Sequence, residues 1–308
     1  MTLLQNTIGG LRYKHWTLHE TFAYFLKGLA RELKITPDFF LEYHKNIVCR
    51  NFKKKWQKRN ANGEWYLDFN GAKLPDISAN KNDLYSFASL YEDVFLIPCF
   101  YNDSYDKKLA ERLDQYMLDG PYGYRNDKFD VTIKNGDVVI DAGAWFGDFS
   151  AYAVSKGAIA YAFEPLKENY KILTETARIN NGQIHPVQKG LGSSVCDMNI
   201  SINGASSSII LKEDGAGEEK ISITTLDKFV EESKLERIDF IKADIEGAER
   251  EMLKGAFNTL KTFTPKLAIC TYHLPDDPEV LEKIILEANP AYKVVHLQHK
   301  LFAAVVGE

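Results

Sequence analysis

Paired cysteines and long apolar runs are both missing from this sequence. Its four cysteines are scattered and form no CxxC pair, so neither a disulfide framework nor a zinc knuckle is expected. The first residues lack the apolar stretch of a signal peptide, and no later run approaches the roughly twenty apolar residues that span a bilayer. We therefore expect a cytoplasmic protein with reduced thiols and no membrane span.

An excess of positive charge is also missing. The formal net charge is -5, which argues against general affinity for nucleic acid. The exception is local: the segment RNFKKKWQKR, residues 50–59, is rich in Lys and Arg. Because the rest of the chain is acidic and no known nucleic-acid module surrounds this segment, we interpret it as a solvated helix end. No nucleic-acid partner is expected.

The chain has room for one large α/β domain and a smaller attachment. Of its 308 residues, 45% are hydrophobic and 26% are charged, as in ordinary globular proteins. Residues 1–85 are predicted to form a mainly helical extension, with a short strand and turn around Asn70 and Gly71. This extension is a natural place for substrate choice or partner contact. Residues 86–308 are predicted to form the main domain.

Strand and helix patterns alternate from about residue 129 onward. Buried apolar runs such as VVIDA and DFIKA are separated by amphipathic stretches, which favours a parallel sheet. The layout predicts an α/β fold: a Rossmann-like, seven-stranded, mostly parallel sheet with helices on both faces and an antiparallel end. Residues 195–224 are predicted to be an inserted hairpin. Residues 246–263 are predicted to be one helix whose apolar face, which includes Phe257, packs on the sheet.

The segment VVIDAGAWFGDFS, residues 138–150, lacks the GxGxxG of a dinucleotide site. Asp148 stands where a pyrophosphate would rest on the helix, and its carboxylate would repel that anion. A ligand with a sulfonium and an ammonium group, such as S-adenosylmethionine, is positively charged at these groups, so Asp141 at the strand tip could attract it. Gly143 would let the backbone approach that ligand closely. The loop positions assigned to the cofactor are Gly143, Ala144, Trp145 and Gly147.

A second acid, Glu164 in YAFEP, ends the next predicted strand. An acid at this point can accept hydrogen bonds from both ribose hydroxyls of an adenosine cofactor, so it supports a nucleoside without choosing between candidates. Taken singly, the glycines could form only a tight turn, and Glu164 could be a helix-start acid favoured by the helix dipole. The combination at this spacing favours nucleoside binding.

Three segments together resemble a known family. VVIDAGAWFGDFSAYAVSKGAIAYAFEP, TTLD and IDFIKADIEGAEREMLKGA look like the FkbM-type methyltransferases, a branch of the class I S-adenosylmethionine-dependent enzymes. The resemblance covers about residues 130–300. It implies a seven-stranded sheet, S-adenosylmethionine as cofactor, and methylation of an oxygen, often on a sugar or polyketide hydroxyl. The residues that it places around the cofactor are Asp141, Gly143, Gly147 and Glu164.

Candidate catalytic residues follow the fourth predicted strand, in ADIEGAE. Methyl transfer to a hydroxyl requires an aligned oxygen and removal of a proton, and the reactive crevice of an open α/β sheet lies beyond the carboxyl ends of its strands. Asp244 is the first candidate, as a base or as an acid that orients the substrate, and it also lies near the cofactor. Glu246 is the second. Glu249 is better explained as a helix-start acid.

His273, in CTYH, follows the fifth strand at the same edge. It is a candidate base, although a lone histidine is more often structural. Relatives often carry an acid in an E-x-H pattern, whereas Thr271 and Tyr272 precede His273 here. Asp244, Glu246 and His273 could ligate a metal in principle, but no dedicated ligand spacing supports this, so no metal is expected.

Two tyrosines in GPYGY, Tyr122 and Tyr124, come just before the first strand of the main domain. They are either a lid over cofactor or substrate or ordinary loop aromatics, and their position favours the lid. Tyr122 is therefore included among the cofactor contacts.

An S-adenosylmethionine-dependent O-methyltransferase acting on a sugar, glycan or other small molecule is the favoured function. One alternative is a nicotinamide-dependent oxidoreductase on a Rossmann fold, which Asp148 and the missing GxGxxG disfavour. The other is a non-catalytic nucleoside-binding protein that acts through its helical extension. The sequence leaves the acceptor and the oligomeric state open.

Overall fold

The computed structural model describes residues 25, 47, 50–76, 122–200, 219–297 and 299–306. Apart from residues 25 and 47, the helices predicted within residues 18–48 and 85–117 lie outside these ranges. The chain divides into two units, Met1–Asn70 with Pro75–Phe100, and Gly71–Leu74 with Tyr101–Glu308. A search of the described residues for a helix long and apolar enough to cross a membrane finds none.

The described part of the first unit contains a helix that ends at residue 56 and a hairpin. Strands β1 (Gln57–Arg59) and β2 (Trp65–Phe69) pair antiparallel. A turn at Asn70 and Gly71, both with positive φ, follows β2, which confirms the predicted strand and turn. The next strand, β3 (Ala72–Pro75), lies mostly in the segment assigned to the second unit. Several basic side chains around the helix end are exposed, in agreement with a solvated helix end.

The second unit is built on a seven-stranded sheet with the order β14-β15-β13-β12-β6-β7-β8. Its strands are β6 (Val138–Ala142), β7 (Ile159–Phe163), β8 (Ile184–Val187), β12 (Phe240–Ala243), β13 (Lys266–Cys270), β14 (Tyr292–His296) and β15 (Lys300–Val305). From β13 to β8 all neighbours pair in parallel, whereas β15 pairs antiparallel with both β13 and β14. The predicted mostly parallel sheet with an antiparallel end is confirmed.

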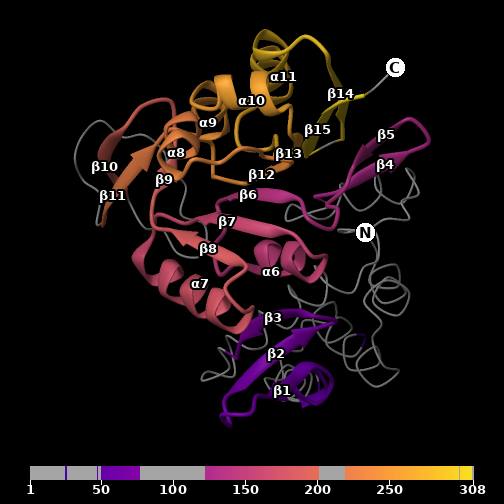
Figure 1. Cartoon of the computed structure of the whole chain (residues 1–308), viewed down its shortest axis with the longest axis vertical. Helices are drawn as coiled ribbons and strands as arrows, with labels where there is room; N and C mark the ends of the chain where they lie inside the picture. Colours follow the sequence, from indigo (N-terminus) through magenta and orange to yellow (C-terminus); the bar gives the residue numbers. More distant parts are fainter. Residues whose placement is uncertain are drawn as a thin grey trace. The chain divides into compact units, whose positions relative to one another are not determined.

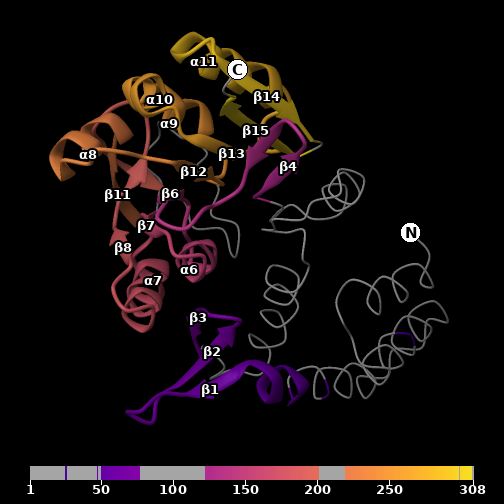
Figure 2. The same cartoon turned by 45° about the vertical axis from the view of Figure 1, so that its right-hand side comes forward.

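Helices cover both faces of this sheet (Figures 1 and 2). They are α6 (Asp148–Ser155), α7 (Lys167–Ile179), α8 (Leu226–Ser233), α9 (Glu249–Lys254), α10 (Phe257–Phe263) and α11 (Asp277–Ala288). Two successive residues of β12 show which helices cover which face of the sheet. Phe240 contacts Phe149 of α6, while Ile241 points to the opposite face, into a core shared with α8 to α11. The buried apolar faces of both helix layers thus hold the strand ends in place.

The single helix predicted for residues 246–263 is wrong, because the chain forms two helices there. The break falls at Gly255, the C-cap of α9, where the backbone packs so closely on the preceding loop that a Cβ atom would lie 2.0 Å from the carbonyl oxygen of Gly192. Asp227 then accepts hydrogen bonds from the backbone N–H groups of Asn258 and Thr259 at the start of α10. The break also turns Phe257 outward, to 39% exposure, although it was expected on the buried face.

Two small sheets accompany the large one. Strands β10 (Cys196–Ile200) and β11 (Glu219–Thr224) form the predicted antiparallel pair, and β9 (Gly190–Leu191) joins β11 in parallel. Strands β4 (Tyr124–Asn126) and β5 (Phe129–Val131) pair where a loop was expected. Tyr124 is 1% exposed and stacks on Phe302 at 5.6 Å. Tyr124 is therefore a core side chain, and the predicted lid is wrong for it.

Candidate active site

The glycine loop, residues 143–147, joins the end of β6 to the start of α6. The N–H groups of Gly143 and Ala144 both donate to the carbonyl oxygen of Phe163, at 3.1 and 2.9 Å. Gly143 has φ of 74°, and a Cβ atom there would lie 2.0 Å from the backbone oxygen of Asp244. Only glycine fits, because the segment after β12 packs directly on this backbone. The loop is thereby fixed to the ends of both neighbouring strands.

The second half of the loop is equally constrained. Gly147 has φ of 84°, and a Cβ atom there would lie 2.7 Å from Leu173 of α7. Trp145 also has a positive φ, 48°, and its half-buried ring stacks on Phe146 at 4.1 Å. Asp148 is the first residue of α6, where the sequence placed it. Both glycines are thus required by the turn itself, and the cofactor contacts assigned to this loop stay predictions.

Glu164 follows β7 and links the glycine loop to α7. Its Oε2 accepts a hydrogen bond from the N–H of Trp145 at 3.0 Å, and its Oε1 accepts one from the N–H of Leu166 at 2.9 Å. The side chain is 4% exposed. Burial raises the pKa of Glu164 to about 7, although the hydrogen bonds from Leu166 and Asn169 act in the opposite direction.

Asp141, at the end of β6, turns into the sheet and faces a buried lysine. Its Oδ1 lies 3.2 Å from Lys242 Nζ, and its Oδ2 accepts a hydrogen bond from Ser150 at 2.7 Å. Lys242 also donates to the carbonyl oxygen of Gly143 at 2.7 Å. Burial lowers the pKa of Lys242, but the carboxylates of Asp141 and Asp244 outweigh it and raise this pKa above the ordinary lysine value. The protein itself thus balances the charge of Asp141.

Asp244, just past β12, is held by two tyrosines. Tyr122 donates to its Oδ2 at 2.6 Å and Tyr272 donates to its Oδ1 at 3.0 Å. Burial raises the pKa of Asp244, but the charge of Lys242 and the hydrogen bond from Tyr122 more than compensate and hold it below its usual value. Asp244 is therefore ionised at neutral pH. Tyr122 is 5% exposed and packs edge-on against Phe149.

Asp244 belongs to a group of four side chains, called here the acid–histidine cluster: Asp244, Glu246, Glu249 and His273. His273 Nδ1 lies 3.1 Å from Glu249 Oε1, and its Nε2 lies 3.5 Å from Glu246 Oε2. Burial lowers the pKa of His273, but the carboxylates of Glu246 and Glu249 outweigh it and raise the pKa to about 10. Glu249 also accepts hydrogen bonds from the N–H groups of Ile245 and Gly247, consistent with a helix-start role.

The structure thus gathers Asp244, Glu246, His273 and Tyr122, whereas Asp141 turns away toward Lys242. Two residues around this site were missed from the sequence. Lys242 lies inside the apolar run IDFIKA, and a lysine within a buried strand is itself a signal, since it requires a partner. Tyr272 was noted only because it stands where relatives carry other residues. Its hydrogen bond to Asp244 depends on the fold and has no local signal.

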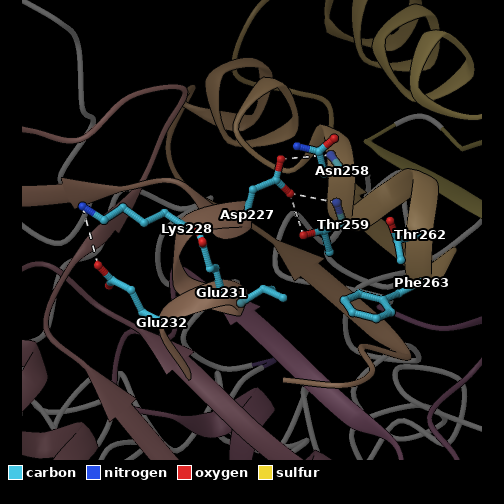
Figure 3. Close-up of a pocket in the computed structure, with 9 residues that line it drawn as sticks. Asp227, Lys228, Glu231, Glu232, Asn258, Thr259, Thr262 and Phe263 are labelled. Carbon is cyan, nitrogen blue, oxygen red and sulfur yellow. Dashed lines mark hydrogen bonds and ion pairs between the residues drawn. The ribbon is translucent and has the colours of Figure 1, made fainter. Parts of the chain in front are cut away.

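A surface hollow lies elsewhere, between α8 and α10 (Figure 3). Its lining includes Asp227, Lys228, Glu232 and Thr259 and none of the residues predicted for the active site. Asp227 already accepts hydrogen bonds from the first turn of α10, and Lys228 pairs with Glu232. The hollow therefore has no evident part in the chemistry at the carboxyl ends of the strands.

A parallel α/β sheet with a glycine loop and with acids after β7 and β12 is the architecture of the open α/β folds whose ligands lie beyond the carboxyl ends of the strands. A family profile described as the methyltransferase FkbM domain matches residues 141–294. The chain belongs to the FkbM methyltransferase family.

The chain is also similar to individual proteins. Hexuronic acid methyltransferase AglP of Haloferax volcanii is 28% identical over 161 residues, which cover 52% of this chain and 66% of that protein. The solved methyltransferase FkbM of Methylobacillus flagellatus is 19% identical, with a TM-score of 0.47 over 85% of this chain and 60% of that one. Fibrillarin of Aeropyrum pernix, solved with natively bound S-adenosylmethionine, is 14% identical, with a TM-score of 0.38 over 64% and 74% of the two chains. The match spans less than two thirds of each of the first two proteins.

Proposed function

We propose that this protein transfers a methyl group from S-adenosylmethionine to an oxygen of a sugar, glycan or other small molecule. Membership of the FkbM methyltransferase family supports the reaction class. The observation that carries the cofactor assignment is the link between Glu164 and the N–H of Trp145, because it fixes a buried carboxylate beside the glycine loop. Such a carboxylate is suited to accept the two ribose hydroxyls of an adenosine cofactor.

The charges around the loop favour this cofactor over a dinucleotide. Asp148 begins α6, so the helix N-terminus that would receive a pyrophosphate already carries an anion. Asp244 adds a second carboxylate at the same edge, just past β12. S-adenosylmethionine, when bound, supplies an electrophilic methyl group on a positively charged sulfur. Asp141, whose charge Lys242 already balances, would stabilise the loop in this proposal and contribute less to direct attraction.

The pKa of Asp244 is lowered and that of His273 is raised, and this difference favours different roles for the two residues. A general base works best when its pKa lies near the operating pH, and the pKa of Asp244 lies below its ordinary value. We therefore assign Asp244 to holding the acceptor hydroxyl in line with the methyl group. His273, with a pKa of about 10, is protonated at neutral pH and cannot take the proton in that state. This revises the sequence-based choice of His273 as a base.

The acceptor class is part of the same proposal. AglP is named as a hexuronic acid methyltransferase, which favours a sugar or glycan acceptor here. The N-terminal extension, residues 1–85, would then select among acceptors. The cytoplasmic location expected from the sequence also stays a proposal.

The test is transfer of tritiated methyl from S-adenosylmethionine to a panel of free sugars, including a hexuronic acid and its neutral counterpart. The proposal expects label in at least one sugar product, with S-adenosylhomocysteine formed in equal amount. A folded chain that binds S-adenosylhomocysteine but labels neither the panel nor a cell extract would support the non-catalytic nucleoside-binding alternative.

A further inference from the structure

The acid–histidine cluster concentrates negative charge beside the proposed reaction centre. Asp244 follows β12 and His273 follows β13, two strands that pair in parallel, so both side chains stand at the same edge of the sheet. Glu246 and Glu249 come from the turn and helix that follow β12. The three carboxylates of the cluster all approach one imidazole, within 3.7 Å of its nitrogens.

His273 is the unusual member of the cluster. Its side chain is 9% exposed, and among the described residues neither ring nitrogen has a partner in hydrogen-bonding geometry. Carboxylate oxygens nevertheless approach both nitrogens, at 3.1 Å from Glu249, 3.5 Å from Glu246 and 3.7 Å from Asp244. A buried imidazole that is surrounded by acceptors but aligned with none of them has the arrangement of an unfilled coordination site.

The spacing of the donor atoms fits a single metal ion. Asp244, Glu249 and His273 each offer a ligand atom, and these atoms all lie within 4.8 Å of one another. Two ligands bound at about 2.0 to 2.1 Å, at tetrahedral angles, lie roughly 3.3 to 3.4 Å apart. His273 Nε2 lies 3.5 Å from Glu246 and 3.7 Å from Asp244, close to that value, whereas Glu249 approaches the other ring nitrogen, Nδ1, at 3.1 Å. Side-chain shifts that bring Glu249 and Asp244 to the same ring nitrogen would complete the site.

We propose that the acid–histidine cluster binds one divalent metal ion, which displaces the proton of His273, with Asp244, Glu249 and His273 as ligands and Glu246 as a further carboxylate within reach. One imidazole with several carboxylates suits Mn²⁺ or Zn²⁺ better than Ca²⁺, which takes oxygen ligands only. The sequence predicted no metal because these residues follow no known ligand spacing. The fold brings them together from two strands.

The role of the ion rests on the proposed methyltransferase function. An acceptor with two neighbouring oxygens, such as a vicinal diol or a hydroxy acid in a sugar, would complete the coordination. The metal lowers the pKa of the bound hydroxyl, whose proton passes to water. The oxygen then forms a bond to the methyl carbon while the carbon–sulfur bond breaks. The electron pair of the carbon–sulfur bond stays on the sulfur, which leaves as neutral S-adenosylhomocysteine. Such chelation would select polyhydroxylated or acidic acceptors.

Direct metal binding tests the proposal without relying on activity. Mn²⁺ is titrated into the full, chelator-treated chain, and the free ion is followed by its electron paramagnetic resonance signal. We expect one Mn²⁺ per chain in the wild type and a loss of affinity of at least about 100-fold in His273→Gln. Glu246→Gln, whose side chain is 36% exposed and should not disturb folding, should weaken binding by about tenfold.

His296→Gln is the matched control. His296 Nε2 lies 2.6 Å from Glu282, so it also pairs with a carboxylate but stands outside the cluster, and its loss should leave Mn²⁺ affinity unchanged. Two results would overturn the metal site. One is a wild type that binds neither Mn²⁺ nor Zn²⁺ in stoichiometric amount. The other is a Mn²⁺ affinity that is equal in the wild type and in folded Glu246→Gln and His273→Gln variants. Binding of S-adenosylhomocysteine by the chelator-treated chain is measured alongside. Its absence would count against the proposed function and leave the metal result standing.

Discussion

Lys242 Nζ lies 3.2 Å from Asp141 Oδ1, and the two side chains form a buried ion pair beneath the glycine loop. Removing one partner of such a pair leaves an uncompensated charge, at a cost of about 3 to 5 kcal/mol. Lys242→Met should therefore lower the free energy of unfolding by about that amount in urea titrations. Combining it with Asp141→Asn should restore part of the loss. Additive losses in the double variant would show that the pair is not coupled.

Gly143 tests the contact between the glycine loop and the segment after β12. Gly143→Ala should destabilise the fold by more than the roughly 1 to 2 kcal/mol of a left-handed backbone, because the new Cβ would meet the Asp244 oxygen at 2.0 Å. Gly182→Ala is the matched control, since Gly182 also has a positive φ but has nothing within 4 Å of the added atom. Equal losses of thermal stability in the two variants would refute the contact.

Glu164 should make cofactor binding depend on pH. Burial raises its pKa from the ordinary 4.5 to about 7, and only the ionised carboxylate accepts both ribose hydroxyls with full charge. The affinity for S-adenosylhomocysteine should therefore rise by about tenfold between pH 6 and pH 8 as the group ionises. Calorimetry at several pH values measures this, and Glu164→Gln should remove the dependence attributable to this group. An unchanged pH profile in Glu164→Gln would contradict the assignment.

The same pKa has a consequence for stability. Because the folded pKa lies above the unfolded one, the native state holds a proton on Glu164 that the unfolded chain has already lost. The stability due to this group is fully present below about pH 4.5 and is lost as the pH rises through about 7, by about 3 kcal/mol in total. Urea titrations of wild type and Glu164→Gln across this range should diverge accordingly. Parallel curves would show an ordinary pKa for Glu164.

Asp244 should affect turnover more than cofactor binding. Asp244→Asn keeps the shape, and its one amide oxygen can still accept a hydrogen bond from Tyr122 or Tyr272, but it loses the second acceptor oxygen and the charge that orients the acceptor. Single-turnover methyl transfer should fall by about 100-fold or more, while affinity for S-adenosylhomocysteine stays within a few-fold. Normal turnover in Asp244→Asn would remove this residue from the reaction.

The sequence predicts the sheet well because its strands are apolar runs that any local reading detects, as in the runs that became β6 and β12. It also places Glu164 and Asp244 just after their strands, where the structure has them, since residues that follow parallel strands meet at one edge; their roles stay predictions. It fails where distant backbones decide the outcome. The close packing at Gly255 depends on Gly192, and the direction of Asp141 depends on Lys242, which lies far along the chain. The acid–histidine cluster is likewise visible only after β12 and β13 have paired.

The central claim, a methyltransferase cofactor site at the glycine loop, is tested most directly by calorimetry with S-adenosylhomocysteine and NAD titrated side by side into the full chain. We predict one S-adenosylhomocysteine bound per chain, no measurable NAD binding, and loss of the S-adenosylhomocysteine signal in a folded Glu164→Ala variant, which lacks two charge-assisted hydrogen bonds of about 1.5 to 3 kcal/mol each. Binding of NAD in place of S-adenosylhomocysteine, or unchanged S-adenosylhomocysteine affinity in Glu164→Ala, would contradict it.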